Sequence, residues 1–369
     1  MADRVAPPAA ASARDRRPDP LLPPLDHEEL YVRRGPRSGL ATVVAIHSTA
    51  RGPALGGCRM WHYAHAAHAV VDALRLARAM TYKAAVADLP LGGGKGVIAL
   101  PPGRPLRGAG RRDALLDFGE TVAALGGRYV TAEDVGVGSR DMPVIAQRTR
   151  HVTGLARDRG GSGDPSPFTA LGVEAAIATA LRHVAGADGP AGRTVAVIGL
   201  GHVGSRVAAR LARAGARLVV ADIDGRRRAL AQRLGARWAT PEEALTAPVD
   251  VLSPCALGGL LDLATVDRLR CRAIVGAAND QLATEAVADR LAARGILWAP
   301  DFVVNAGGLV NIATELDPAG YDAARARRRA RAIGATLDAI LTAAARDGVT
   351  PLAAATALAR RRLADAGGA

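Results

Sequence analysis

The chain contains only two lysines, Lys83 and Lys95, although 48 of its 369 residues are lysine or arginine. Arginine stays charged near neutral pH, whereas a buried lysine can lose its proton, so we expect the two lysines at positions where arginine will not serve. The alternative is that codon drift happened to leave two. Lys95 directly follows a run of three glycines, 92–94, and an acidic pair, Glu133 and Asp134, lies further along the chain.

Two amines and a carboxylate can together bind and activate a small charged substrate. One lysine can hold a substrate carboxylate as a fixed positive charge. A second amine close to the first is driven toward neutrality by like charge and burial, and it then becomes a usable base. An acid near both can exchange protons with the substrate. The glycine run would let the backbone come close to the ligand.

A separate motif predicts a dinucleotide cofactor. The apolar run Val195–Ile198 leads into Gly199-Leu200-Gly201-His202-Val203-Gly204, and a helical pattern follows. The first glycine of such a motif permits a tight turn, the second lets the backbone approach a pyrophosphate, and the third allows close packing of helix on strand. The phosphates would lie at the helix N-terminus, where free N–H groups favour anions.

An acidic residue beyond this motif indicates which dinucleotide is bound. Asp222 ends the next predicted strand, 18 residues after Gly204, where a carboxylate can bind the ribose 2′-hydroxyl of NAD. A 2′-phosphate would meet that negative charge, so we expect NAD. The arginines at 226–228 follow closely and could bind such a phosphate, which leaves NADP as the alternative.

Apolar periodicity and turn residues predict the elements that would position these groups. Residues 28–33 and 40–47 flank a turn cluster, as in a hairpin, and helices are expected over 66–79 and 113–125 with a short strand at 129–131. Beyond a Gly/Ser/Pro-rich segment at 159–167, strands and helices alternate, which predicts a parallel α/β sheet. The expected ranges there are helices at 169–185 and 202–214, strands at 194–198, 217–221, 249–252 and 273–276, and helices over 321–363 with a break near 348–351.

The length of the chain predicts two domains. Residues 1–25, rich in alanine, proline and arginine, are expected to be a disordered tail. We place a catalytic domain at 26–160 and an NAD-binding Rossmann domain at 161–344, because the segment at 159–167 has the composition of a linker and the strand–helix alternation begins after it.

The composition argues against several other classes of protein. The net charge of +13 would suit a nucleic-acid-binding protein, but the arginines are scattered along the chain. The densest run, 325–331, lies on an alanine-rich helical pattern, which is typical of a solvent-exposed helix face. Only 11 residues are aromatic, which leaves few side chains to stack on bases. There is no apolar run of membrane-spanning length and no signal-peptide pattern, so we expect a cytoplasmic protein without nucleic-acid or membrane partners. The sequence does not predict a metal site, because the three cysteines are isolated from one another. The histidines at 62, 65 and 68 begin a helical pattern and do not indicate one either.

These segments resemble the glutamate/leucine/phenylalanine/valine dehydrogenases, in order and over nearly the whole chain from about residue 28. The resemblance rests on six segments: Gly52-Pro53-Ala54-Leu55-Gly56-Gly57, Met80-Thr81-Tyr82-Lys83 through Lys95, Thr131 to Gly136, Pro254-Cys255-Ala256-Leu257-Gly258-Gly259, Gly276-Ala277-Ala278-Asn279, and Ala299-Pro300-Asp301 to Gly308. It implies an α/β fold of two domains across a cleft, with the C-terminal helix, 345–369, returning to the first domain. It also implies a homo-oligomer.

The resemblance assigns roles to individual residues. Lys83 would bind the substrate α-carboxylate, Lys95 would be the base that activates water, and Asp134 would exchange protons with the substrate nitrogen. The backbone of Gly57 would line the site and Asn305 would contact the amino group. Other positions complete the set: Thr169 and Asn279 at the nicotinamide, Cys255 and Ala256 beside the cofactor, and Ala132, Leu309 and Ile312 on the wall of the substrate pocket.

The same resemblance indicates the reaction and the class of substrate. An L-amino acid, NAD⁺ and water would give a 2-oxo acid, ammonium and NADH. Glutamate dehydrogenases carry a lysine where this chain has Leu55, and a charged substrate facing Leu55 would be buried without a partner. An apolar substrate of the leucine/valine type is therefore expected, with phenylalanine as the alternative. A noncatalytic NAD-binding regulator, which would not need Lys95, is the other class of function to be tested.

Overall fold

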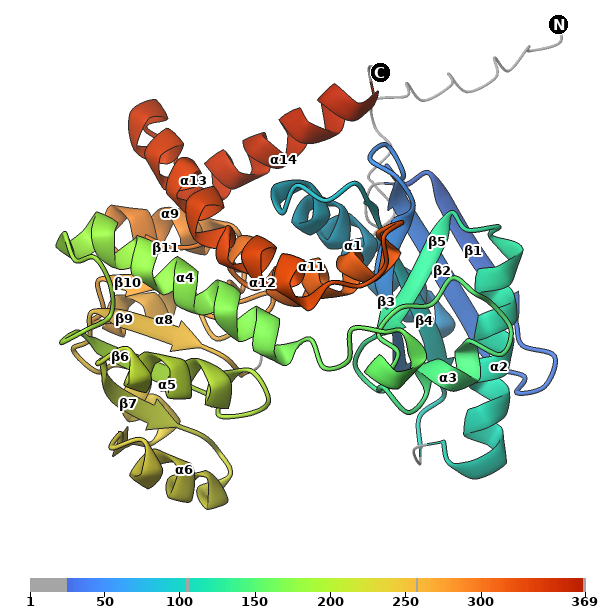
Figure 1. Cartoon of the computed structure of the whole chain (residues 1–369), viewed down its shortest axis with the longest axis horizontal. Helices are drawn as coiled ribbons and strands as arrows, with labels where there is room; N and C mark the ends of the chain where they lie inside the picture. Colours follow the sequence, from blue (N-terminus) through green and yellow to red (C-terminus); the bar gives the residue numbers. More distant parts are fainter. Residues whose placement is uncertain (1–24, 104–105, 257, 368–369) are drawn as a thin grey trace, which may run out of the picture.

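The computed structural model describes residues 25–103, 106–256 and 258–367, and in this part of the chain two α/β units face each other, each built on its own sheet (Figure 1). The two-domain α/β expectation is confirmed. The predicted tail lies outside the described residues except for Leu25. None of the described helices is both long and apolar enough to cross a membrane.

The first unit is built on a mixed five-stranded sheet with the order β1-β2-β4-β3-β5. The predicted hairpin is confirmed, because β1 pairs with β2 in antiparallel fashion. β3 runs parallel to both β4 and β5, so these three strands point the same way. Their bounds are β1 Glu29–Arg34, β2 Ala41–Ser48, β3 Ala54–His62, β4 Gly92–Leu100 and β5 Tyr129–Glu133.

Two helices cover opposite faces of this sheet. α1 (Ala66–Val86) packs against the face that carries Val43, Ala45 and Val97, and α2 (Gly108–Ala124) packs against the face that carries Val44, Ile46 and Ile98. α1 continues seven residues beyond the predicted end at residue 79, which makes Lys83 a helical residue. The short helix α3 (Met142–Ile145) follows β5 and contacts α2.

The glycines at 92–94, which precede Lys95, are the first residues of β4. A Cβ atom on Gly93 would lie 2.0 Å from the backbone nitrogen of Thr81, so no larger residue fits beneath α1. Gly93 therefore lets the helix that carries Lys83 lie directly on the strand that carries Lys95.

The second unit contains a six-stranded sheet with the order β11-β10-β9-β6-β7-β8, in which every pair of neighbours is parallel. The parallel sheet predicted from the strand–helix alternation is confirmed. The strands are β6 Thr194–Ile198, β7 Arg217–Ala221, β8 Arg237–Trp238, β9 Val251–Pro254, β10 Ala273–Ile274 and β11 Leu297–Trp298. The helices along this part of the chain are α4 Ser166–Ala185, α5 Gly204–Arg213, α6 Arg228–Arg233, α7 Pro241–Leu245, α8 Leu263–Arg268 and α9 Ala286–Ala293.

The last helices connect the two units. α10 (Asp301–Val304) contacts α1 in the first unit and α4 in the second, and α14 (Pro351–Gly367) packs along α1 (Figure 1). Arg362 fixes this packing, because its Nη1 atom donates to the carbonyls of Ala85 and Val86 at 3.0 and 2.7 Å. The helices between them are α11 Gly307–Ala313, α12 Ala323–Arg331 and α13 Ile333–Asp347. The returning helix thus begins at Pro351, after a break at Gly348, and not at residue 345.

Candidate active site

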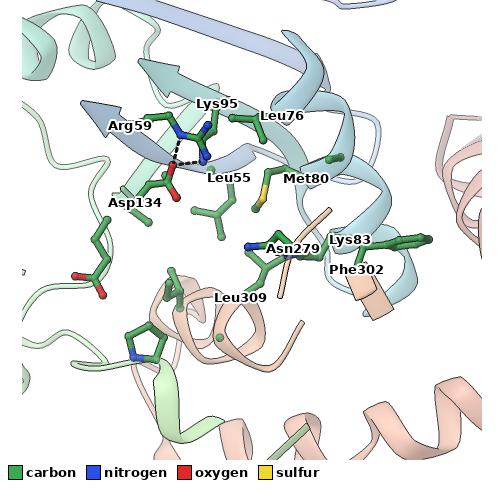
Figure 2. Close-up of a pocket in the computed structure, with 18 of the residues that line it drawn as sticks. Leu55, Arg59, Leu76, Met80, Lys83, Lys95, Asp134, Asn279, Phe302 and Leu309 are labelled. Carbon is green, nitrogen blue, oxygen red and sulfur yellow. Dashed lines mark hydrogen bonds and ion pairs between the residues drawn. The ribbon is translucent and has the colours of Figure 1, made fainter. Parts of the chain in front are cut away.

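A cavity of about 260 Å³ lies between the two sheets and is lined by both lysines, Asp134 and a set of apolar side chains (Figure 2). α1 contributes Lys83, β4 contributes Lys95, and Asp134 directly follows β5. These groups lie far apart in the sequence, and parallel strands with a helix laid across them bring them to one cavity.

Lys95 and Asp134 form the central ion pair of the cavity. The Nζ atom of Lys95 lies 2.7 Å from Oδ2 of Asp134, and the Lys95 side chain is only 6% exposed. Burial opposes ionisation of Asp134, but the positive charges of Lys95 and Arg59 outweigh it and hold its pKa below the ordinary value. Glu133 contacts neither cation, and burial raises its pKa. The two members of the acidic pair therefore have different environments.

Lys83 approaches the same cavity from the opposite side. Its Nζ atom donates to the amide oxygen of Asn279 at 3.1 Å, so it reaches from α1 to the second unit. Burial lowers the pKa of Lys83, the nearby Asp301 acts against this, and the charge of Lys95 lowers the pKa further. Lys95, the residue expected to be the base, instead has Asp134 as its direct partner.

An apolar wall faces these charged groups. Leu55, which is 1% exposed, packs in one cluster with Ala132, Leu309 and Ile312, the residues expected on the pocket wall. All four line the cavity. Leu76 and Met80 line it too and were not predicted. Their signal was the spacing of 76, 80 and 83, which places them on the same face of α1 as Lys83.

Gly57 shapes the floor next to Asp134. A Cβ atom at this position would lie 2.7 Å from Cβ of Asp134 and 2.6 Å from the backbone oxygen of Glu133. Glycine at 57 therefore allows β3 and the end of β5 to lie close together, with the Gly57 backbone exposed to the cavity as expected.

The predicted cofactor residues form a turn between β6 and α5. Gly199 has a φ of 94°, which only glycine adopts readily. A Cβ atom on Gly204 would lie 1.8 Å from the oxygen of Gly199, whereas one on Gly201 would meet nothing within 4 Å. The first and third glycines thus serve the turn and its packing, and the backbone of the second is open to an incoming group, which fits a pyrophosphate.

A second hollow of about 760 Å³ connects this turn to the lysine cavity. It is lined by His202, Val203 and Cys255, and it shares Glu133, Asp134 and Pro165 with the first cavity. Ala256 touches the Cβ position of Gly199, 2.7 Å away, and Cys255 touches that of Gly204, 3.0 Å away. An elongated ligand on the glycine turn can therefore extend into the cavity that holds the lysines.

Asp222 lies at the end of β7, where the sequence places it. Its Oδ2 atom accepts from the backbone nitrogen of Leu200 at 2.6 Å, and Oδ1 accepts from that of Asp224 at 2.8 Å. Nearby arginines have protein partners: Arg226 donates to Asp224 at 2.8 Å, and Arg228 lies over the ring of Trp238.

The remaining predicted residues lie in the first cavity or beside it. Thr169 and Asn279 both line the first cavity. Asn305 does not line this cavity. Its side chain is turned toward Asn279, and its amide nitrogen donates to Oδ1 of Asn279 at 2.9 Å. Within the described part of the chain, the Oδ1 atom of Asn305 is buried without a hydrogen-bond partner, which leaves an acceptor for a ligand.

The residues most clearly missed by the sequence are Arg59, Asp301 and Phe302, which also line the cavity. Arg59 donates through Nε to Oδ2 of Asp134 at 3.2 Å. Burial raises the pKa of Asp301, and its charge faces Lys83. Among 46 arginines, nothing in the sequence distinguishes Arg59 from one on the surface.

Comparison with known proteins agrees with this geometry. Residues 30–151 match the family model "Glu/Leu/Phe/Val dehydrogenase, dimerisation domain", and residues 220–368 match "Glutamate/Leucine/Phenylalanine/Valine dehydrogenase". The chain belongs to the glutamate/leucine/phenylalanine/valine dehydrogenase family. It is thus an amino-acid dehydrogenase, and the family implies a nicotinamide cofactor. The residues on the glycine turn and in the adjoining hollow fit such a group.

Individual relatives within the family cover almost the whole chain. It is 41% identical over 339 residues to the leucine dehydrogenase of Thermoactinomyces intermedius, which covers 92% of this chain and 91% of that one. It is 44% identical over 346 residues to the valine dehydrogenase of Streptomyces albus, covering 92% and 93%. The crystal structure of L-tryptophan dehydrogenase from Nostoc punctiforme aligns with a TM-score of 0.81 and 37% identity, over 93% of this chain and 97% of that one.

Proposed function

We propose that this dehydrogenase oxidatively deaminates a branched aliphatic L-amino acid of the leucine/valine type, reversibly and with NAD. The observation that carries this proposal is the wall opposite the lysines, where Leu55, Ala132 and Leu309 form a continuous apolar surface. A charged substrate side chain would be desolvated there without a partner, which costs several kcal/mol. The leucine and valine dehydrogenases among the relatives support the same substrate class.

The roles proposed for the polar residues follow from their positions. Lys83 binds the substrate α-carboxylate, since it presents an ammonium at the edge of the cavity. The substrate nitrogen then lies toward Asp134, which exchanges protons with it, and Lys95 activates the water that attacks the imine carbon. An entering ammonium substrate adds a cation beside Lys95, and like charges at close range favour loss of one proton. A nicotinamide cofactor held at the glycine turn would supply the acceptor for the hydride that leaves the substrate Cα.

Other residues would hold the substrate and the nicotinamide end of the cofactor. Thr169 and Asn279 line the first cavity, and the nicotinamide would lie against them. Asn305 would contact the amino group through its unpaired oxygen; this requires Asn279 to move, because the Asn305 side chain is turned toward it. Leu55, Ala132, Leu309 and Ile312 would select the substrate side chain, with the Gly57 backbone beneath it.

The choice of NAD rests on Asp222. Its carboxylate would accept a hydrogen bond from a ribose 2′-hydroxyl and repel a 2′-phosphate. Arg226 and Arg228, which could otherwise neutralise that phosphate, already have partners in Asp224 and Trp238. His202 and Val203 would lie along the pyrophosphate, with Cys255 and Ala256 on the far side of the turn.

An aromatic side chain is the second candidate for the substrate. The tryptophan dehydrogenase of Nostoc punctiforme, at 37% identity, supports this alternative. Ile312 and Leu309 would then bind the ring, and the reaction would be unchanged.

The organisation of the chain supports three further parts of the proposal. We divide it into a catalytic domain at 26–160, joined by α14, and a cofactor domain at 161–344, since the strands of the two sheets fall in 29–133 and 194–298. The match to a dimerisation domain supports a homo-oligomer. The described cysteines, all unpaired, fit a reducing compartment such as the cytoplasm.

Initial rates of NADH formation, measured at 340 nm with valine, leucine, phenylalanine, tryptophan and glutamate, test the proposal. We expect the highest kcat/KM with valine or leucine, and with NAD⁺ rather than NADP⁺. Faster turnover of phenylalanine or tryptophan would establish the second candidate. Glutamate as the best substrate would contradict the role of the apolar wall, and no turnover of any amino acid would favour a noncatalytic NAD-binding regulator.

A further inference from the structure

The carboxylate of Asp134 is held by a second cation, which comes from β3. Arg59 donates through Nε to Oδ2 of Asp134 at 3.2 Å, and Lys95 contacts the same oxygen at 2.7 Å. β3 lies between β4 and β5 in the sheet, so the three groups come from adjacent strands. Figure 2 shows both cations on one oxygen, with the other carboxylate oxygen turned away from them toward the open cavity.

The guanidinium of Arg59 is itself fixed from the other side. Its Nη1 atom donates to Oδ2 of Asp72 at 2.8 Å, and the hydroxyl of Tyr63 donates to the same oxygen at 2.7 Å. The other oxygen of Asp72 accepts from Arg75 at 3.1 Å. A planar guanidinium with donors at fixed angles can contact two carboxylates at once, which a lysine ammonium on a flexible stem does much less precisely. The orientation of Arg59 is thus set by α1 and β3.

These groups are largely shielded from water. The side chains of Arg59, Asp72 and Asp134 are 22%, 16% and 23% exposed. Removing one partner from such a cluster leaves the opposite charge buried without compensation. The position of each charged side chain therefore depends on the partners on both sides of it.

We propose that Arg59 positions Asp134 for the reaction by fixing one oxygen of its carboxylate, so that the other oxygen faces the substrate nitrogen. The proposal rests on the proposed function, in which Asp134 exchanges protons with that nitrogen. Proton transfer needs heavy atoms within hydrogen-bond distance and in line, and a misplacement of about 1 Å can lower a rate by about 100-fold. Arg59 acts through Asp134 and not on the substrate.

The electrostatic surroundings of Asp134 make this role measurable. The charged or titratable groups around it are Lys95 from β4, Arg59 and Cys58 from β3, Tyr129 from β5, Lys83 from α1 and the adjacent Glu133. Among these groups, all in the described part of the chain, only Lys95 and Arg59 contact its carboxylate as cations. Loss of the Arg59 charge should therefore move the titration of Asp134 to higher pH.

The test compares Arg59→Met, Arg59→Lys and Asp72→Asn with the wild-type enzyme, using the amino acid that the wild type oxidises fastest. Arg59→Met should lower kcat about 10- to 100-fold, leave KM for the amino acid within about twofold, and move the acidic limb of the kcat–pH profile upward. Arg59→Lys should leave that limb near its wild-type position but keep kcat low, because charge is retained and the two-sided contact is lost. Asp72→Asn should lower kcat while the Arg59 charge remains.

Arg37→Met is the matched control, since Arg37 pairs with Asp117 and Glu120 in the same domain but away from the cavity. It should leave kcat and its pH profile unchanged. Wild-type kcat and pH profile in all three test variants would overturn the proposal. So would a rise in KM alone, which would assign Arg59 to substrate binding.

A titration independent of turnover separates this proposal from the proposed function. The ¹³C signal of the Asp134 carboxyl carbon, assigned by its loss in Asp134→Asn, should titrate at higher pH in Arg59→Met than in the wild type. If the wild type oxidises no apolar amino acid, the proposed substrate class fails while this shift still supports the Arg59–Asp134 contact. An unchanged titration would overturn the proposal whatever the substrate.

Discussion

The ammonium of Lys83 and the amide oxygen of Asn279 lie 3.1 Å apart and join the two units across the cleft. The same oxygen also accepts from Asn305 at 2.9 Å. A substrate carboxylate that binds Lys83 must therefore share or displace the Asn279 contact. Asn279 also lines the cavity that holds both lysines, so a substrate bound in that cavity meets this amide.

Substrate affinity should weaken in alkaline solution because of Lys83. Burial lowers its pKa below the ordinary 10.5, so the neutral amine, which cannot hold a carboxylate, forms at a lower pH than for an exposed lysine. KM for the amino acid, measured from about pH 7 upward at saturating cofactor, should rise before pH 10.5 is reached. Lys83→Arg, which stays charged, should have a higher KM throughout but a flatter alkaline limb. The same upward limb in both enzymes would assign the titration to the substrate.

Lys95 should be essential for turnover and dispensable for cofactor binding. Lys95→Ala should lower kcat by about 10²- to 10⁴-fold, the usual contribution of a general base. The affinity for NADH, measured by fluorescence titration, should change little, because Lys95 lies on β4 and the glycine turn lies in the other unit. Full turnover in Lys95→Ala would show that another group acts as the base.

Leu55 should determine both stability and substrate preference. Leu55→Ala should lower the free energy of unfolding by about 2–5 kcal/mol, as expected for a buried leucine, and the enlarged pocket should raise kcat/KM for phenylalanine relative to leucine. Urea unfolding and initial rates measure the two effects. Leu115→Ala is a matched control, since Leu115 is equally buried but packs in the cluster around α2. It should cost similar stability without altering preference, and an equal change in preference would remove Leu55 from the substrate pocket.

Asp222 should set the preference between NAD and NADP. Asp222→Ser should lower kcat/KM with NAD⁺ by about 10- to 100-fold, the value of a hydrogen bond to a charged group, and should raise it with NADP⁺ because the repulsion is removed. Asp250→Ser provides a control, since Asp250 also accepts a backbone N–H, from Thr194, but precedes β9 instead of ending β7. The two variants should differ in cofactor preference. Identical preferences would contradict the assignment.

The sequence by itself determined the parallel sheet of the second unit and its glycine turn. Both depend on neighbours in the chain: an apolar strand of five residues, a turn that needs glycine at fixed offsets, and a helix that follows directly. The scarcity of lysine likewise singles out Lys83 and Lys95 from composition alone. The strand, the turn and the helix can be predicted from sequence because the residues that interact in them are close together in the chain.

Only the tertiary structure decided how the charged groups are paired. Arg59, Asp72 and Asp134 are spread over 75 positions and meet because β3, α1 and β5 pack together. Their geometry pairs Asp134 with Lys95, while Lys83 donates to Asn279, and composition cannot reveal these pairings. The same holds for Gly93, since the need for glycine there depends on the helix lying over it. Charge and close packing act through space, and the chain order does not encode those distances directly.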